Sequence, residues 1–169
     1  IHNGGKRRHV EYFPQKPFEA LPDDFRRQLL GMNRNPQQVL FDGAVDSDAY
    51  LKFLVAELKP YIDSHFSVAT GPRHTAVMGS SMGGLISIYA LCEYPQVFGG
   101  AVALSTHWVG KPSAWGTPEK IQNAAFPMAA FRYLQQHLPA PGAHRLYMDH
   151  GTTGLDAIYG PHQGLVDEI

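Results

Sequence analysis

A serine with catalytic potential stands at position 81, inside a short glycine-rich turn. Residues 79–83, GSSMG, fit the pattern G-x-S-x-G. In enzymes this pattern forms a nucleophile elbow, a tight turn from a strand into a helix that exposes the serine hydroxyl above a parallel sheet. A serine hydroxyl becomes a useful nucleophile once a neighbouring base takes its proton. These residues therefore indicate nucleophilic catalysis through a covalent intermediate on Ser81.

The residues on either side of the turn predict the strand and the helix that an elbow needs. Residues 75–78 are apolar and partly β-branched, as a buried strand is. Residues 85–92 predict a helix that ends before Pro95, because the residue before a proline avoids helical conformation. The backbone N–H of Met82, at the start of this helix, is the expected oxyanion donor. Gly79 and Gly83 are expected to let the strand and the helix pass closely.

Helices and strands are predicted to alternate through the rest of the chain. The clearest helix covers residues 47–66, where apolar residues recur at three- and four-residue steps, and Pro60 should kink or shorten it. Further apolar runs predict strands at 99–105 and 145–149 and helices at 117–137, with a possible break at Pro127, and from 163 to 169. This alternation predicts an α/β fold with a doubly wound, mostly parallel sheet.

The first 46 residues carry weaker signals. Residues 10–14 are expected to be extended. Residues 14–46 are rich in Pro, Gly, Asn and Asp and are expected to be mainly a loop, with one helical turn near residues 23–30. Asp46 or Ser47 is expected to cap the helix that follows.

Composition limits the classes of function. Of the 169 residues, 44% are hydrophobic and 17% charged, which is typical of a single globular domain spanning residues 1–169. A net charge of −1 predicts no basic surface for nucleic acid. No apolar run reaches the ~18 residues of a membrane span. Three aspartates between residues 42 and 48 lack the order of an EF-hand loop, so neither a metal nor a cofactor is expected.

Three segments resemble the Putative esterase (esterase D-like) family of α/β-hydrolases, which includes enterochelin-type and feruloyl-type esterases. The strongest is VMGSSMGGL at residues 77–85, and residues 98–108 and 147–157 match more weakly. The resemblance covers most of the chain from about residue 50 onward. It implies an α/β-hydrolase fold, a triad in the chain order Ser, acid, His, and a small-molecule carboxylic ester as the substrate.

The same resemblance suggests the other site residues. The acid of the family follows a Gly-Thr turn, which Asp156 matches best, with Asp149 at the preceding strand end as the alternative. Only His162 follows Asp156, but the catalytic histidine of the family comes after the last helix, so His162 is a poor candidate for the base. His107 and Trp108 follow a predicted strand and are expected to line the substrate pocket.

Two parts of the family pattern have no match in this sequence, namely the loop with the second oxyanion donor and the segment with the catalytic histidine. The resemblance therefore implies the central and later part of an α/β-hydrolase. We expect the 169-residue chain alone to be a poor catalyst, because no well-placed base follows the acid and one oxyanion donor is absent. We also expect it to be a poor soluble monomer, because strand 75–78 would form an open apolar edge. An acyltransferase of the same fold, or a non-catalytic binding module that kept the elbow, are the alternatives to a serine esterase.

Overall fold

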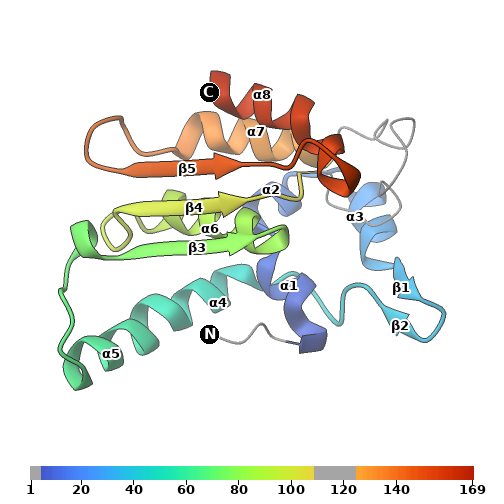
Figure 1. The fold of residues 1–169 in the computed structure, drawn as a ribbon. Helices are drawn as coiled ribbons and strands as arrows, with labels where there is room; N and C mark the ends of the chain where they lie inside the picture. Colours follow the sequence, from blue (N-terminus) through green and yellow to red (C-terminus); the bar gives the residue numbers. More distant parts are fainter. Residues whose placement is uncertain (1–4, 109–124) are drawn as a thin grey trace.

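Three parallel strands form the central sheet of this computed structural model, which describes residues 5–108 and 125–169 (Figure 1). The strands are β3 (Ala76–Ser80), β4 (Gly100–Leu104) and β5 (Arg145–Asp149), and they lie side by side in chain order. Helix α6 (Met82–Glu93) joins β3 to β4, and α7 (Ala125–His137) precedes β5. The predicted α/β fold class and the three predicted strands are confirmed.

One face of this sheet packs against helix α6, which contacts both β3 and β4 along their length. Side chains that point to the opposite face are much more exposed, and three of them form a row across the strands. Met78 pairs in register with Val102, and Val102 with Tyr147. Met78 is 71% exposed and Tyr147 57% exposed. The described residues therefore bury one face of a parallel sheet and leave apolar side chains on the other.

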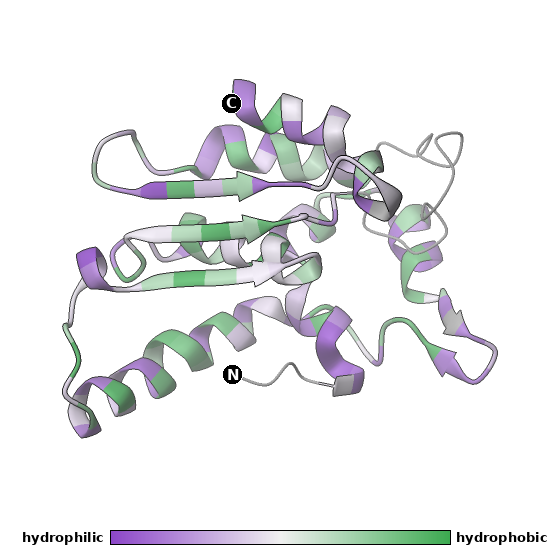
Figure 2. Ribbon diagram, viewed as in Figure 1, coloured by the Kyte–Doolittle hydropathy of each residue, from purple (hydrophilic) through white to green (hydrophobic). Residues whose placement is uncertain are grey.

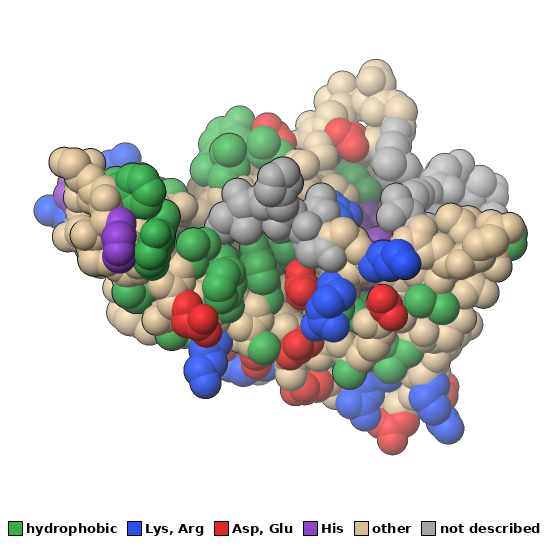
Figure 3. All heavy atoms as spheres, turned by 90° about the horizontal axis from the view of Figure 1, so that it is seen from below, with side chains coloured by type: hydrophobic (Ala, Val, Ile, Leu, Met, Phe, Trp, Pro, Cys, Tyr) green, Lys and Arg blue, Asp and Glu red, His purple; other side chains and the backbone are tan. Residues whose placement is uncertain are grey.

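Strand β3 is the outer strand of the described sheet, and its free edge faces a long helical segment. A groove of about 500 Å³ lies between them, lined mostly by apolar residues of the helical segment and of β3. Figure 3 shows hydrophobic side chains gathered on the part of this surface formed by the helical segment, beside mixed acidic and basic side chains. Large exposed hydrophobic residues there include Tyr61, Phe66 and Val68. The predicted apolar edge is thus present, and the expectation of a poor monomer stays a prediction.

The predicted helix over residues 47–66 is confirmed, with a change of pitch in its middle. It consists of α4 (Ser47–Phe53), a π-helical stretch η2 (Leu54–Leu58) and α5 (Lys59–His65). Pro60 lies in the first turn of α5. Because proline has no N–H, it cannot make the regular bond to the carbonyl four residues earlier, and the preceding turn widens. Figure 2 shows polar and apolar residues alternating along α4 and α5, as expected of a half-buried helix.

The first 46 residues are more helical than predicted. The expectation of an extended segment at residues 10–14 is wrong, because helix α1 (Arg8–Tyr12) occupies most of it. The expectation of a mainly irregular segment 14–46 is also wrong, although the helix at residues 23–30 is confirmed. The elements there, after η1 (Gly5–Arg7), are α2 (Gln15–Glu19), α3 (Asp23–Leu30), β1 (Asn33–Asn35) and β2 (Gln38–Val39).

Prolines explain why this segment gave a loop signal. Pro17 lies in the first turn of α2, and Pro22 is the residue that precedes α3. At the start of a helix the missing N–H of proline costs nothing, so these prolines open helices instead of breaking them. The helices and the turn between α1 and α2 bury large side chains in the core, among them Phe13, Phe18 and Leu29.

The expected cap at residues 46 and 47 takes a different form. Asp46 occupies the N-cap position of α4, but its carboxylate makes no capping hydrogen bond and instead accepts one from Arg7 at 3.1 Å. The hydroxyl of the buried Ser47 accepts the backbone N–H of Gln15 at 2.9 Å. Both residues therefore tie α4 to the N-terminal helices.

In the last third of the chain, helix α7 lies behind the sheet and α8 (Gly160–Glu168) packs against α7 (Figure 1). Helix α7 continues through Pro127, where a break was predicted, because this proline lies in the first turn. The predicted start of that helix at residue 117 lies outside the described residues. After β5 come η6 (Gly154–Tyr159) and α8, which begins three residues before the predicted position. No helix among the described residues combines the length and the apolar character needed to cross a bilayer.

A pair of glycine substitutions tests how closely β3 approaches α6. A Cβ atom on Gly79 would lie 2.5 Å from the backbone oxygen of Gly83, whereas a Cβ atom on Gly83 would meet nothing within 4 Å. We expect Gly79→Ala to lower the free energy of unfolding by about 2–3 kcal/mol, because backbone must shift. Gly83→Ala, the matched control, should leave it unchanged or raise it by up to ~1 kcal/mol. Urea denaturation measures both, and equal midpoints would contradict the observed packing.

Candidate active site

Ser81 sits at the junction of β3 and α6 in the backbone shape that a nucleophile elbow requires. Its φ is 57° and its ψ is −119°, a conformation that non-glycine residues adopt at a cost of about 1–3 kcal/mol. Its N–H donates to the carbonyl of Leu104 at 2.9 Å, and its own carbonyl accepts the N–H of Gly84 at 3.0 Å. The strained turn is thus bonded to both the neighbouring strand and the helix, which holds the serine at the carboxyl end of the sheet.

The start of α6 offers a donor beside this serine. Met82 is the first residue of the helix, so its N–H has no acceptor within the helix and lies at the positive end of the helix dipole. A Cβ atom on Gly84 would come within 2.5 Å of the hydroxyl of Thr106. Glycine at position 84 therefore lets the first turn of α6 sit directly against the chain that leaves β4.

The chain that leaves β4 bends sharply at Ser105, whose φ is 44°. The Ser105 N–H donates to the carbonyl of Asp149 at 2.9 Å and approaches a carboxylate oxygen of the same residue at 3.3 Å. The Ser105 hydroxyl donates to Oδ2 of Asp156 at 2.7 Å. One residue therefore contacts both aspartates that the sequence offered as the acid.

The structure brings the predicted serine and both predicted acids to the same end of the sheet. Ser80, Leu104 and Asp149 are register partners across the three strands, so the residues that follow them emerge side by side. Asp156 returns to this end within η6 and is half-buried. Ser81 is hydrogen-bonded to Leu104 at the end of β4, and Asp156 is hydrogen-bonded to the next residue, Ser105. The end of β4 therefore links the serine to the acid.

His107 and Trp108 lie deeper than a pocket lining would require. His107 is 2% exposed and Trp108 is 1% exposed. Nδ1 of His107 is 2.8 Å from the hydroxyl of Tyr159, and the Trp108 ring packs against Phe131 at 5.7 Å between centroids. Both side chains support the strand end from within the core, and their contact with a substrate stays a prediction.

Burial also decides the charge of His107. Desolvation, followed by the nearby positive charges of His9 and Arg8, lowers the pKa of His107 to about 3. The imidazole is therefore neutral at physiological pH and too weakly basic to take a proton from Ser81. His107 precedes both aspartates in the chain, so it also breaks the order Ser, acid, His of the family, and its low pKa argues further against it as the general base.

His162 lies on helix α8, which packs against α7. It is 7% exposed, and its ring centroid is 6.3 Å from that of Phe131 in α7. This packing does not favour the already weak prediction that His162 is the base. His150 is another histidine at this end of the sheet, but it precedes Asp156 and so breaks the chain order of the family. It directly follows β5, and its Nε2 lies 3.4 Å from the position that a Cβ atom on Gly160 would take.

Two residues of this constellation, Ser105 and Tyr159, were missed by the sequence analysis. Ser105 follows a predicted strand directly, and polar residues at that position of a parallel sheet are often functional, so this signal was present. Tyr159 is separated from His107 by 52 residues, and no local pattern marks it as a partner.

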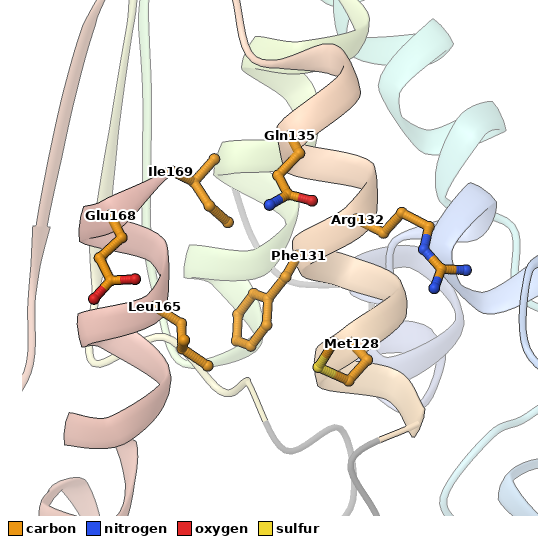
Figure 4. Close-up of a pocket in the computed structure, with 7 residues that line it drawn as sticks. All are labelled: Met128, Phe131, Arg132, Gln135, Leu165, Glu168 and Ile169. Carbon is orange, nitrogen blue, oxygen red and sulfur yellow. The ribbon is translucent and has the colours of Figure 1, made fainter.

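A separate pocket lies between α7 and α8, away from the strand ends (Figure 4). It has a volume of about 530 Å³ and is lined by Met128, Phe131, Arg132, Gln135, Leu165, Glu168 and Ile169. None of the candidate catalytic residues contributes to it, so we do not assign it to the site. The described residues also contain no group of three His, Cys, Asp or Glu side chains arranged to hold a metal ion.

Comparison with known families supplies the identification. Residues 34–157, well over half of the chain, match the family described as "Putative esterase". The chain belongs to this esterase family. The match includes the elbow, both aspartates and the tail of β4, residues 105–108, which directly follow this strand. These are the residues that the geometry brings together.

Individual relatives of this esterase chain are more distant. The uncharacterized protein YbbA of Bacillus subtilis (strain 168) is 33% identical over 60 residues, which are 35% of this chain and 24% of that protein. The enterochelin esterase of Shigella flexneri is 20% identical with a TM-score of 0.40, over 88% of this chain and 40% of that one. The enterobactin esterase FES of the same organism, solved with 2,3-di-hydroxy-N-benzoyl-glycine, is 22% identical with a TM-score of 0.38, over 72% of this chain and 38% of that one. The esterase chain thus spans about a quarter of the curated relative and about two fifths of the solved enzymes.

Proposed function

We propose that the protein hydrolyses carboxylic esters of small molecules through an acyl-enzyme on Ser81. The observation that carries this proposal is the strained elbow. Ser81 adopts a positive φ at the junction of a parallel strand and a helix N-terminus, and a strain of this kind persists where function requires it. Membership of an esterase family selects ester hydrolysis among the reactions that an activated serine can perform.

Three groups of this chain have a role in the proposed reaction. Oγ of Ser81 attacks the acyl carbon, and its proton passes to the histidine that the triad order of the family implies, which the Asp156 carboxylate orients. The N–H of Met82 donates to the carbonyl oxygen as negative charge develops there. Collapse of the tetrahedral intermediate expels the alcohol, which takes the proton, and leaves the acyl group on Ser81. Water then attacks the acyl-enzyme by the same steps and releases the acid.

Covalent labelling tests this proposal without knowledge of the natural ester. A fluorophosphonate probe phosphonylates an activated serine and should leave one adduct on the peptide that contains residues 80 and 81, located by tandem mass spectrometry. Ser80→Ala is the matched control and should still be labelled, whereas Ser81→Ala should not. An adduct on a different residue, or equal labelling of heat-denatured protein, would contradict an activated Ser81.

A further inference from the structure

We propose that Ser105 is a positioning residue that holds the carboxylate of Asp156 in place for catalysis. The inference rests on the proposed function and adds a residue to the same site. It begins from the backbone. Among the described non-glycine residues, only Ser81 and Ser105 have positive φ angles. They follow neighbouring strands at the same end of the sheet, so the strain is concentrated at the candidate active site.

The first contact that supports this role is a hydrogen bond between the side chains of Ser105 and Asp156. Oγ of Ser105 donates to Oδ2 of Asp156 at 2.7 Å. A hydrogen bond to a carboxylate is shorter and stronger than one between neutral groups, so it can fix the orientation of that carboxylate. The bond uses one oxygen, and the other stays available for the N–H of a histidine, because a carboxylate accepts several hydrogen bonds.

The same carboxylate oxygen also lies close to backbone. A Cβ atom on Gly151 would lie 2.8 Å from Oδ2 and 3.0 Å from Cβ of Asp156. The carboxylate therefore packs directly against the main chain of Gly151 while it accepts the Ser105 hydroxyl. Two neighbours, one polar and one steric, limit the side-chain conformations open to Asp156.

A second contact fixes the segment that carries the acid. Two residues after Ser105, the buried His107 bonds through Nδ1 to the hydroxyl of Tyr159, three residues after Asp156. The N–H of His107 also donates to the carbonyl of Ser81 at 3.3 Å. The tail of β4 is thus bonded to η6 at two points and to the nucleophile at a third, so it sets the distance between serine and acid.

The backbone turn and the hydroxyl of Ser105 can be tested separately. Ser105→Ala removes the hydroxyl and keeps the strain, whereas Ser105→Gly removes the hydroxyl and relieves the strain. We expect both variants of the intact protein to lower kcat for p-nitrophenyl acetate by a similar factor, roughly 10- to 100-fold, as for loss of one hydrogen bond to a charged group. KM should change less than about threefold, because the contact orients a triad member and not the substrate. Ser64→Ala, whose hydroxyl bonds only within its own helix, is the control and should leave kcat unchanged.

A double-variant comparison shows whether the effect passes through Asp156. In an Asp156→Asn background, Ser105→Ala should cost less than about twofold further, because the carboxylate that it positions is already gone. Full activity of both Ser105 variants beside an inactive Asp156→Asn would overturn the positioning role and leave the proposed function intact. Loss in Ser105→Ala with full activity in Ser105→Gly would also overturn it, since the turn alone would then matter. An active Asp156→Asn would overturn both the positioning role and the assignment of the acid.

Discussion

Ser81→Ala is expected to reduce ester hydrolysis by about 10⁶-fold, to the level left by substrate binding and the oxyanion donor alone. The reason is that, in the proposed reaction, the Ser81 hydroxyl forms the covalent intermediate, and alanine has no nucleophile to replace it. The initial rate of p-nitrophenyl acetate hydrolysis by the intact protein measures the effect. The variant should keep its fold, because alanine has the same Cβ atom as serine at this φ. Circular dichroism checks this.

Ser80→Ala is the matched control for this experiment. Ser80 is the last residue of β3 and its side chain is exposed, so its replacement should change the rate less than about threefold. If Ser81→Ala kept a substantial fraction of the turnover of the unmodified protein, Ser81 would not be the nucleophile. A different residue would then carry the reaction, and the elbow would be a strained turn without a catalytic role.

Asp156→Asn is expected to lower kcat by about 10³–10⁴-fold, since an amide in place of the triad carboxylate holds the histidine in the wrong tautomer. Asp149→Asn is the matched comparison. Asp149 accepts the N–H of Ser105 at 3.3 Å through Oδ1, and an asparagine oxygen can accept the same bond. We therefore expect a reduction below about tenfold from Asp149→Asn.

The comparison of the two aspartates distinguishes the two predictions for the acid. Rates for both asparagine variants are measured over a range of ester concentrations, so that kcat and KM are obtained separately. A much greater loss of kcat in Asp149→Asn than in Asp156→Asn would move the triad acid to the end of β5. The hydrogen bond between Ser105 and Asp156 would then stabilise the turn and have no part in catalysis.

Those features that depend on neighbouring residues were predictable from the sequence. The elbow needs an apolar strand, small residues and a helix start within about 20 residues, and all of them are present around Ser81. The strand at residues 145–149 was placed correctly because apolar residues are bounded there by turn residues. The sequence placed Gly79 and Gly83 where strand and helix approach closely. This is confirmed for Gly79, where a Cβ atom would lie 2.5 Å from the backbone oxygen of Gly83, whereas a Cβ atom on Gly83 would meet nothing within 4 Å.

The features that the sequence did not reveal depend on residues far apart in the chain. Helix α1 forms where Val10 and Tyr12 suggested an extended segment, and burial of Val10 beneath α4 and α6 outweighs that preference. The bonds from Ser105 to Asp156 and from His107 to Tyr159 span 51 and 52 residues. Nothing in local composition encodes such a pairing, because it exists only after β4 and β5 have paired.

The two positive φ angles at Ser81 and Ser105 have a consequence for the evolution of this protein. Glycine would relieve about 1–3 kcal/mol of strain at each position. At Ser105 the loss of the hydrogen bond to Asp156 offsets this gain, so random substitution raises heat resistance most readily at Ser81. A laboratory selection for thermal stability alone would therefore enrich glycine at position 81 and recover stable proteins without a nucleophile. A selection that includes ester turnover should keep serine at both positions, so the contrast between the two regimes identifies residues retained for chemistry.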